Sequence, residues 1–161
     1  MIYARDTAVM TTPIGSVRIE GSDSAVEAIR ILTERETPRR ADSPAVIAAV
    51  EQIEAWFKGA LQDFDLALAP PATPRGLELR QGLIAVGYGE TLTYGELARR
   101  LGSASRAIGQ LCSRNPFPIV VPCHRVLSSG GAKENYSGGH GAATKIWLLD
   151  HERRLSGKTL L

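Results

Sequence analysis

The sequence predicts an α+β protein, with a small N-terminal β-sheet domain that includes a helix and a mostly helical C-terminal domain. Three observations lead to this fold class. The first 36 residues carry short β-prone runs around a turn signal at Pro13-Ile14-Gly15. Two hydroxyl–proline pairs, Ser43-Pro44 and Thr73-Pro74, each precede apolar residues at helical spacing. A proline-rich linker at residues 69–74 separates the two patterns, so we expect an N-terminal α/β domain at residues 1–70 and a second domain at 71–161.

Each N-terminal element has its own signal. Val9, Val17 and Ile19 lie in the β-prone runs, whereas residues 25–32 fit a strand or a helix. The helix expected after Pro44 places its apolar residues on one face and stops at a glycine: Val46, Ile47, Val50, Ile53, Trp56, Phe57 and Gly59. Residues 64–68 predict one more short strand.

The C-terminal part predicts a series of helices. A first helix begins at Thr73-Pro74, with Leu79, Leu83 and Val86 on one face, and a last one covers about residues 142–154, with Ile146, Trp147 and Leu149. Between them, Thr93 and Glu96 form a capping box that starts a short helix. A turn at Gly102 leads into a second short helix at about 105–114, with Ile108, Leu111 and Cys112 inward. Two short helices around a glycine turn indicate a helix-turn-helix, although an αα-hairpin without a DNA function has the same pattern.

Composition and charge narrow the class of protein. The chain has 161 residues, and no apolar run is long enough for a membrane span. Its two cysteines form no disulfide framework and show no zinc-ligand spacing with the three histidines, so we expect a reduced, intracellular, cytoplasmic protein without a metal. Between residues 96 and 126 the sequence contains a single acid, Glu96, and several basic residues, all of them arginines: Arg99, Arg100, Arg106, Arg114 and Arg125. This cluster fits either a binding surface for a polyanion or an ordinary solvated basic face.

The segment Pro122-Cys123-His124-Arg125-Val126 contains the candidate nucleophile. A cysteine thiolate is the reactive species, and the neighbouring histidine offers a base. The apolar residues 119–121 predict a strand that stops at Pro122. Neighbours in an extended chain point to opposite faces, so contact between Cys123 and His124 requires a bend after Pro122 or a bridging water. A buried, inert cysteine is the structural alternative.

Several segments together resemble one known family. They are Tyr94–Ala98, Arg106–Gly109, Asn115-Pro116, Pro122–Val126, Asn135–Gly139 and Lys145–Glu152. Over about residues 88–152 the sequence resembles the O6-alkylguanine-DNA alkyltransferases, also called methylated-DNA–protein-cysteine methyltransferases. The resemblance implies a DNA-repair protein that flips O6-alkylguanine out of duplex DNA and keeps the alkyl group on its own cysteine in a single turnover.

The resemblance also implies a role for each matched residue. Cys123 would attack the alkyl carbon, His124 would act as the base through a water, and Glu152 would orient His124. Asn115 would link the helix-turn-helix to the active-site turn, and Tyr94 would donate a proton to the leaving guanine. Arg106 would fill the gap left by the flipped base, from a helix in the minor groove. Further DNA contacts are expected from Thr93, Ser105, Gly109 and Arg114, and the substrate pocket from Pro118, Tyr136, Ser137 and Gly138.

The implied partners are double-stranded DNA and its alkylated guanine, with no cofactor, for a monomer whose cooperativity on DNA stays open. Some positions depart from the family pattern, notably Arg75-Gly76, Gly87, Leu111-Cys112 and a short link between Tyr94 and Arg106. These departures affect the DNA footprint, stability and tolerance of bulky adducts, not the reactive centre. Two rivals remain: a helix-turn-helix protein that binds lesions without alkyl transfer, and a cysteine hydrolase that uses Cys123 and His124.

Overall fold

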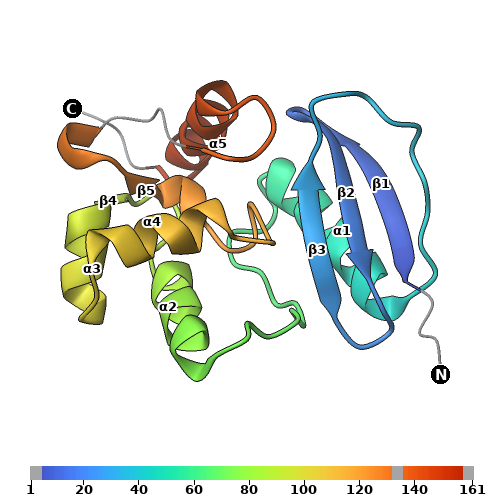
Figure 1. Ribbon diagram of the computed structural model, residues 1–161. Helices are drawn as coiled ribbons and strands as arrows, with labels where there is room; N and C mark the ends of the chain where they lie inside the picture. The colour runs from blue at the N-terminus through green and yellow to red at the C-terminus, as the bar shows by residue number, and fades with distance from the viewer. Residues whose placement is uncertain (1–4, 132–135, 158–161) are drawn as a thin grey trace. The chain divides into compact units, whose positions relative to one another are not determined.

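The structure is a computed structural model that describes residues 5–131 and 136–157. It has the mixed α+β architecture that the sequence predicts (Figure 1). By its internal contacts the chain separates into two compact units, Met1–Ala69 and Pro70–Leu161, and the division falls in the proline-rich segment. Residues 1–4, within the first β-prone region, and Asn135, within one of the motifs, lie outside the described residues.

The N-terminal unit contains a three-stranded antiparallel sheet. Its strands β1 (Asp6–Thr12), β2 (Gly15–Gly21) and β3 (Val26–Ile31) follow one another in the order β1-β2-β3. The predicted turn is tight, because Thr12 pairs with Gly15 and only residues 13 and 14 connect the two strands. Gly15 adopts a φ of 107°, a conformation that favours glycine. Residues 25–32, which fitted either a strand or a helix, therefore contain the strand β3.

Helix α1 (Pro44–Phe57) packs against this sheet, as Figure 1 shows. The buried residues of α1 are Val46, Ala49, Ile53 and Trp56. The predicted stripe is confirmed in part, since Val50 and Phe57 are only half-buried and Ile47 is 38% exposed. The strand predicted at residues 64–68 is wrong, because this segment makes a single parallel bridge from Leu68 to Val26. Pro70 and Pro71 follow at once and have no backbone N–H, so pairing along the edge of β3 cannot continue.

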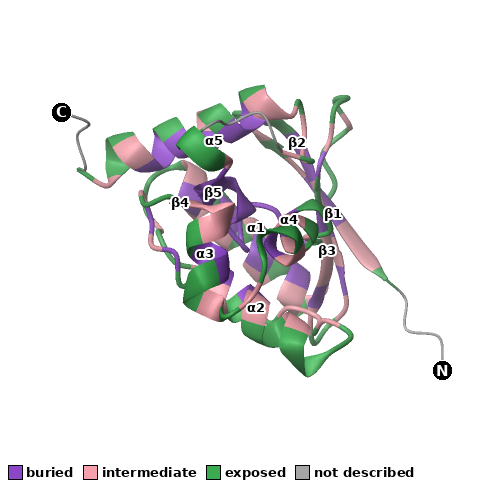
Figure 2. Ribbon diagram, turned by 60° about the vertical axis from the view of Figure 1, so that its left-hand side comes forward, coloured by how far each residue is buried: buried purple, intermediate pink, exposed green. Residues whose placement is uncertain are grey.

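The C-terminal unit is mostly helical, as predicted. Its helices are α2 (Pro74–Ile84), α3 (Tyr94–Leu101), α4 (Ser105–Ser113) and α5 (Ala142–Leu155). The segments between these helices contain short 3-10 turns at Cys123–Arg125 and Ser129–Gly131. They also contain two two-residue strands that pair in parallel, β4 (Leu92–Thr93) and β5 (Val126–Leu127). Figure 2 shows that α5 alternates between buried and exposed residues along its length, so one side of it packs inward. Of the three apolar residues named for this helix from the sequence, Leu149 is buried, Trp147 is half-buried and Ile146 is 41% exposed.

Helices α3 and α4 form the predicted helix-turn-helix. The Thr93 hydroxyl accepts a hydrogen bond from the Glu96 amide at 3.1 Å, and the Glu96 carboxylate accepts one from the Thr93 amide at 3.0 Å, so the capping box is present. Gly102 ends α3 with a φ of 62°, which is the left-handed conformation common at helix C-termini. In α4, Ile108 and Cys112 are buried and Leu111 is half-buried.

The strand predicted at residues 119–121 is wrong. The segment forms a turn instead, in which the Val121 amide donates to the Phe117 carbonyl at 2.8 Å. Ile119 has a φ of 74°, an unusual conformation for a β-branched residue, and its buried side chain holds it there. A short strand, β5, comes after Cys123 rather than before it.

Candidate active site

Cys123 begins a 3-10 turn that supplies the bend required for a Cys–His pair. The turn covers Cys123–Arg125, and the Arg125 amide closes it by donating to the Pro122 carbonyl at 3.0 Å. The Cys123 amide donates to the Val121 carbonyl at 2.8 Å. All three side chains of the turn are buried, and Cys123 is 4% exposed. The tight turn therefore delivers three adjacent functional groups into one interior region.

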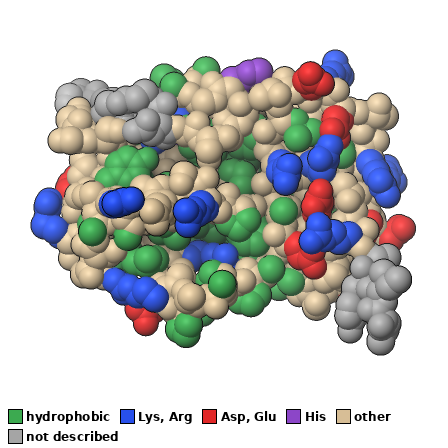
Figure 3. Space-filling model, viewed as in Figure 1, with side chains coloured by type: hydrophobic (Ala, Val, Ile, Leu, Met, Phe, Trp, Pro, Cys, Tyr) green, Lys and Arg blue, Asp and Glu red, His purple; other side chains and the backbone are tan. Residues whose placement is uncertain are grey.

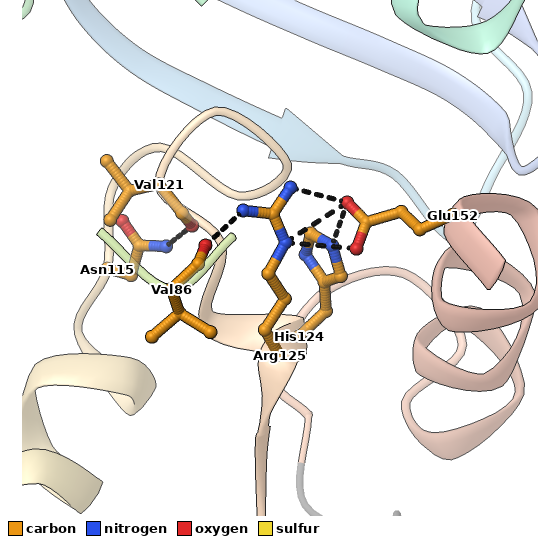
Figure 4. A network of polar contacts seen from close by, with 6 residues as sticks. All are labelled: Val86, Asn115, Val121, His124, Arg125 and Glu152. Atoms are coloured by element: carbon orange, nitrogen blue, oxygen red, sulfur yellow. Dashed lines mark hydrogen bonds and ion pairs between the residues drawn. The ribbon is translucent and has the colours of Figure 1, made fainter. Parts of the chain in front are cut away.

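Asn115 connects the end of α4 to this turn through its side chain. Its Nδ2 donates to the Val121 carbonyl at 2.8 Å and to Cys123 Sγ at 3.2 Å, and its Oδ1 accepts from the Phe117 amide at 3.0 Å. Figure 4 shows the amide facing Val121. A single side chain thus holds Phe117 and Val121, in the segment before the 3-10 turn, and provides a donor to the sulfur.

His124 is paired with Glu152, which comes from α5. The distance from His124 Nε2 to Glu152 Oε2 is 3.0 Å, and both side chains are fully buried (Figure 4). Burial alone would raise the pKa of Glu152, but His124 and Arg125 lower it to about 2, so the group is a carboxylate. A carboxylate only accepts hydrogen bonds, so Nε2 carries the proton, and Nδ1 is the basic nitrogen.

The protonation states favour a resting thiol beside a neutral imidazole. Burial raises the pKa of Cys123, although the Asn115 hydrogen bond and the charge of Lys145 oppose this. Burial also lowers the pKa of His124, against the opposing effect of Glu152. The thiol is therefore protonated until a base removes its proton, and His124 is available as that base.

A cavity of about 1020 Å³ opens onto Cys123. Residues from the start of α3, from α4, from the active-site turn and from the segment after residue 135 line it: Thr93, Tyr94, Gly95, Arg99, Ser105, Arg106, Gly109, Cys112, Ser113, Cys123, Ser128, Ser129, Tyr136 and Ser137. The nucleophile and the arginine at the start of α4 thus share one hollow. The cavity is ample for a nucleobase.

Comparison with known proteins gives one consistent result. The family model described as "6-O-methylguanine DNA methyltransferase, DNA binding domain" matches residues 78–154. The methylated-DNA–protein-cysteine methyltransferase of Mycobacterium leprae is 34% identical, with 99% of each chain covered. That of Methanosarcina acetivorans is 35% identical, with 82% of this chain and 89% of the relative covered. This chain belongs to the methylated-DNA–protein-cysteine methyltransferase family.

Solved structures of the family agree with this assignment. The crystal structure of Mycobacterium tuberculosis O6-methylguanine methyltransferase has a TM-score of 0.79 at 32% identity, with 94% of each chain covered. Mycobacterium tuberculosis OGT in complex with DNA has a TM-score of 0.79 at 34% identity, with 92% of this chain and 93% of that chain covered. The resemblance stated from the motifs is confirmed over nearly the whole chain.

The predicted methyltransferase residues fall into two groups in the structure. One group lines the cavity: Thr93, Tyr94, Ser105, Arg106, Gly109, Cys123, Tyr136 and Ser137. The other lies outside the lining: Asn115, His124 and Glu152 are behind Cys123, Arg114 is exposed at the end of α4, Pro118 is buried in the turn, and Gly138 is half-buried. The reactive group and the predicted DNA-facing helix are brought together, whereas Pro118 and Gly138 lie outside the cavity wall.

Several residues of the site had no role in the sequence interpretation. Arg99 lines the cavity, whereas the sequence indicated it only as one member of the arginine cluster. Cys112 also lines it, and burial raises the pKa of this second thiol to about 12. Lys145 is fully buried and donates to the Val126 carbonyl at 2.6 Å. It belongs to the motif Lys145–Glu152, but the sequence indicated no role for it.

Tyr136 contributes a polar group to the cavity wall. Its hydroxyl is buried and makes no hydrogen bond to the described residues. Burial raises the pKa of Tyr136 well above its ordinary value, so the phenol is a donor and not an anion.

The visible face of the C-terminal unit in Figure 3 carries more Lys and Arg side chains than acidic ones, whereas both signs mix on the visible face of the N-terminal unit. Arg99, Arg100, Arg106 and Arg114 are exposed, but Arg125 is only 4% exposed. Arg125 therefore does not belong to the predicted basic surface. Its charge acts inside the protein.

Two further properties concern the described residues as a whole. They contain no helix long and apolar enough to cross a membrane. Within residues 5–131 and 136–157, no group of three or more His, Cys, Asp or Glu residues is arranged to hold a metal ion.

Proposed function

We propose that this protein repairs O6-alkylguanine in duplex DNA by transferring the alkyl group to Sγ of Cys123. The observation that carries the proposal is the shared cavity, with Cys123 on its wall and Arg106 from the start of the DNA-facing helix at its edge. A base inside a duplex has to leave the stack to reach such a sulfur. Membership of the family and the geometry of the site support the same reaction.

The reaction balances without a cofactor. His124 takes the thiol proton, the sulfur attacks the alkyl carbon, and the bond from that carbon to O6 breaks as the carbon–sulfur bond forms. The leaving guanine receives a proton from Tyr94, which lies at the start of α3 and lines the cavity. The product is a thioether with no leaving group for a reverse reaction, so each molecule reacts once.

The mode of DNA binding follows from the position of Arg106. Its side chain is long, cationic and exposed at the second residue of α4, which suits it to fill the gap left by a flipped nucleotide. Entry of α4 into the minor groove brings this arginine and Cys123 to the same nucleotide. Under this proposal the protein acts as a monomer. It works in the cytoplasm, where DNA and a reducing environment for Cys123 coexist.

An intact-mass experiment tests the reaction. The protein is mixed with a duplex oligonucleotide that contains one O6-methylguanine, and its mass is measured before and after. We expect a gain of one CH2 unit, located on Cys123 by peptide mapping, with one lesion repaired per protein molecule. The Cys123→Ala variant should bind the duplex without any gain. Repair of many lesions per molecule would instead indicate a hydrolase, and binding without a mass gain in the native protein would indicate a lesion-binding protein.

A competition experiment tests the groove. A small minor-groove ligand bound next to the lesion should slow repair, whereas methylation of guanine N7 in the major groove should leave the rate unchanged. The opposite pattern would contradict minor-groove entry by α4.

A further inference from the structure

Arg125 is a buried cation that does not face DNA. It is 4% exposed and directly follows His124 in the 3-10 turn. A guanidinium stays charged in a protein, so burying it is unfavourable unless its N–H groups all find partners. The partners of Arg125 therefore indicate what it does.

Most of these contacts end on Glu152. Arg125 Nε lies 3.0 Å from Oε1 and 3.2 Å from Oε2 of Glu152, and Nη2 lies 2.7 Å from Oε2. On the other side, Nη1 donates to the Val86 carbonyl at 2.6 Å, and the guanidinium lies 5.8 Å from the centre of the Tyr88 ring. Figure 4 shows the guanidinium held between Val86 and the carboxylate. The side chain is thus fixed at both ends, in a two-point contact with Glu152.

Glu152 divides its two oxygens between its partners. Oε1 accepts from Arg125, whereas Oε2 accepts from both Arg125 Nη2 and His124 Nε2. A carboxylate held by the histidine alone is free to rotate about its last side-chain bond. The planar guanidinium removes that freedom and leaves Oε2 directed at His124.

We propose that Arg125 is a positioning residue for alkyl transfer, which clamps Glu152 so that this carboxylate holds His124 with its proton on Nε2 and its basic nitrogen at Nδ1. The proposal rests on the proposed function, because it assigns His124 the task of taking the thiol proton. Cys123, His124 and Arg125 then form one working unit: the nucleophile, its base, and the group that fixes the partner of that base.

The charge of Arg125 has a second effect on the base. The ionisable groups around His124 are Glu152, which raises its pKa, and Arg125 and Lys145, which lower it, with the Cys123 thiol next in the chain. Tyr88 faces Glu152 and Arg125 with its phenol, whose pKa burial raises, so it stays uncharged. Burial is the main cause of the lowered pKa of His124, and Arg125 adds to it by offsetting part of the effect of Glu152, so the imidazole is neutral and able to accept a proton.

Four variants test the proposal: Arg125→Lys, Arg125→Met, Glu152→Gln and the double variant Arg125→Met/Glu152→Gln. The single-turnover rate of alkyl transfer from the O6-methylguanine duplex is measured against pH, on protein whose fold is verified by circular dichroism. We expect Arg125→Met to slow transfer by about 10- to 100-fold, as for other residues that orient a catalytic group. The double variant should differ from Glu152→Gln by less than about threefold, because Arg125 acts through the carboxylate.

The pH profile distinguishes positioning from a general loss of stability. Loss of Arg125 raises the pKa of His124, so the acid limit of the reaction should move to higher pH in Arg125→Met. In Glu152→Gln the acid limit should move to lower pH, because the carboxylate that raises the pKa of His124 is lost. Arg125→Lys keeps the charge but loses the two-point contact, so its acid limit should stay while its rate falls.

The tautomer of His124 gives a readout that does not depend on activity. Nitrogen chemical shifts from a 15N-histidine-labelled protein should show the proton on Nε2 in the native protein and a mixture of tautomers in Arg125→Lys. If the native protein gains no alkyl group, the proposed function fails, and the tautomer experiment alone decides the role of Arg125.

Three results would overturn the proposal. They are a folded Arg125→Met protein with the native rate, a double variant slower than Glu152→Gln by the full Arg125→Met factor, or an unchanged tautomer in Arg125→Lys. If Arg125→Met does not fold, Arg125→Lys still decides, because its rate and the tautomer of His124 both report on the two-point contact.

Discussion

The Cys123 sulfur is a poor nucleophile at rest, and its surroundings make it reactive only during the reaction. Burial raises its pKa, so the thiol keeps its proton and resists oxidants and stray electrophiles. Asn115 donates to the sulfur at 3.2 Å, and the charge of Lys145 favours the same anion. The thiolate therefore forms when His124 takes the proton, with stabilising groups already in place.

Asn115→Asp tests the donor to the sulfur. Aspartate keeps an oxygen acceptor for the Phe117 amide but loses the N–H groups and adds a negative charge beside Cys123. The pKa of the thiol should rise further, and transfer from O6-methylguanine free base should slow by about 10- to 100-fold at neutral pH, as expected for losing a hydrogen bond to a developing charge. A rate equal to that of the native protein would show that this hydrogen bond does not contribute to thiolate formation.

Arg106→Ala tests the residue that replaces the flipped base. Repair in duplex DNA should fall by about 10-fold or more, because extruding a base costs a few kcal/mol that a gap-filling side chain offsets. The reaction with O6-methylguanine free base should be unchanged. Arg100→Ala is the matched control, because Arg100 is an exposed arginine of α3 that does not line the cavity. Equal losses in the two variants would mean that Arg106 contributes only its charge.

At the scale of the elements, local capping decides where α3 begins and ends. The box of Thr93 and Glu96 starts α3, and Gly102 ends it. The next helix, α4, has Ala104 as its N-cap residue, lacks a side-chain cap and has no acidic residue in its first turn. Its first amide groups are thus left for other partners, which is compatible with a helix that meets a phosphate backbone.

Gly109→Ala separates the stability of α4 from its function. Gly109 is the central residue of α4, and an added Cβ would meet no described atom within 4 Å. Alanine should stabilise the helix by up to about 1 kcal/mol and raise the melting temperature by a few degrees. Because Gly109 lines the cavity, the new methyl group should nevertheless slow repair in duplex DNA.

Gly102→Ala serves as the control for that change. Gly102 has a φ of 62°, so alanine there should lower stability by about 1 kcal/mol and leave the repair rate of the folded protein unaltered. A Gly109→Ala protein that is more stable and repairs duplex DNA at the native rate would show that the DNA does not approach this face of α4.

At the scale of the whole molecule, the two units differ in what they bury. Among the described residues, the buried ionisable side chains other than the cysteines all belong to the C-terminal unit: Arg80, Tyr88, His124, Arg125, Lys145, His151 and Glu152. The core of the N-terminal unit is apolar apart from Ser16. Three of them, His124, Arg125 and Glu152, form the polar network behind Cys123.

The stability of the C-terminal unit should depend on acid pH through Glu152. The pKa of Glu152 is about 2 in the folded protein against an ordinary value of 4.5. A lowered folded pKa means that the contribution is complete above pH 4.5 and is lost as the pH falls towards 2. Denaturant unfolding, followed by Trp147 fluorescence in a Trp56→Phe background, should show this loss in the native protein and a smaller one in Glu152→Gln. Parallel losses in both proteins would contradict the assignment.

Two failures of sequence interpretation come from side-chain partners that propensity and charge patterns do not show. The segment at residues 119–121 is apolar and β-prone, yet Asn115 donates to the Val121 carbonyl, six positions later, and the chain turns instead. Arg125 looks like a member of a basic surface, yet it is buried against Glu152, 27 positions later. In both cases a specific polar contact decides the structure, and only the folded chain shows that contact.

The sequence by itself determined the two short helices around a glycine turn and their approximate bounds, because caps, glycines and neighbours act over a few residues. Only the tertiary structure decided that Glu152 reaches His124, that Arg125 and Lys145 are interior cations, and that Cys123 opens into the same cavity as Arg106. These relations depend on packing α5 and α4 around one tight turn. Burial sets the charge and the reactivity of each group, and burial is a property of the assembled unit.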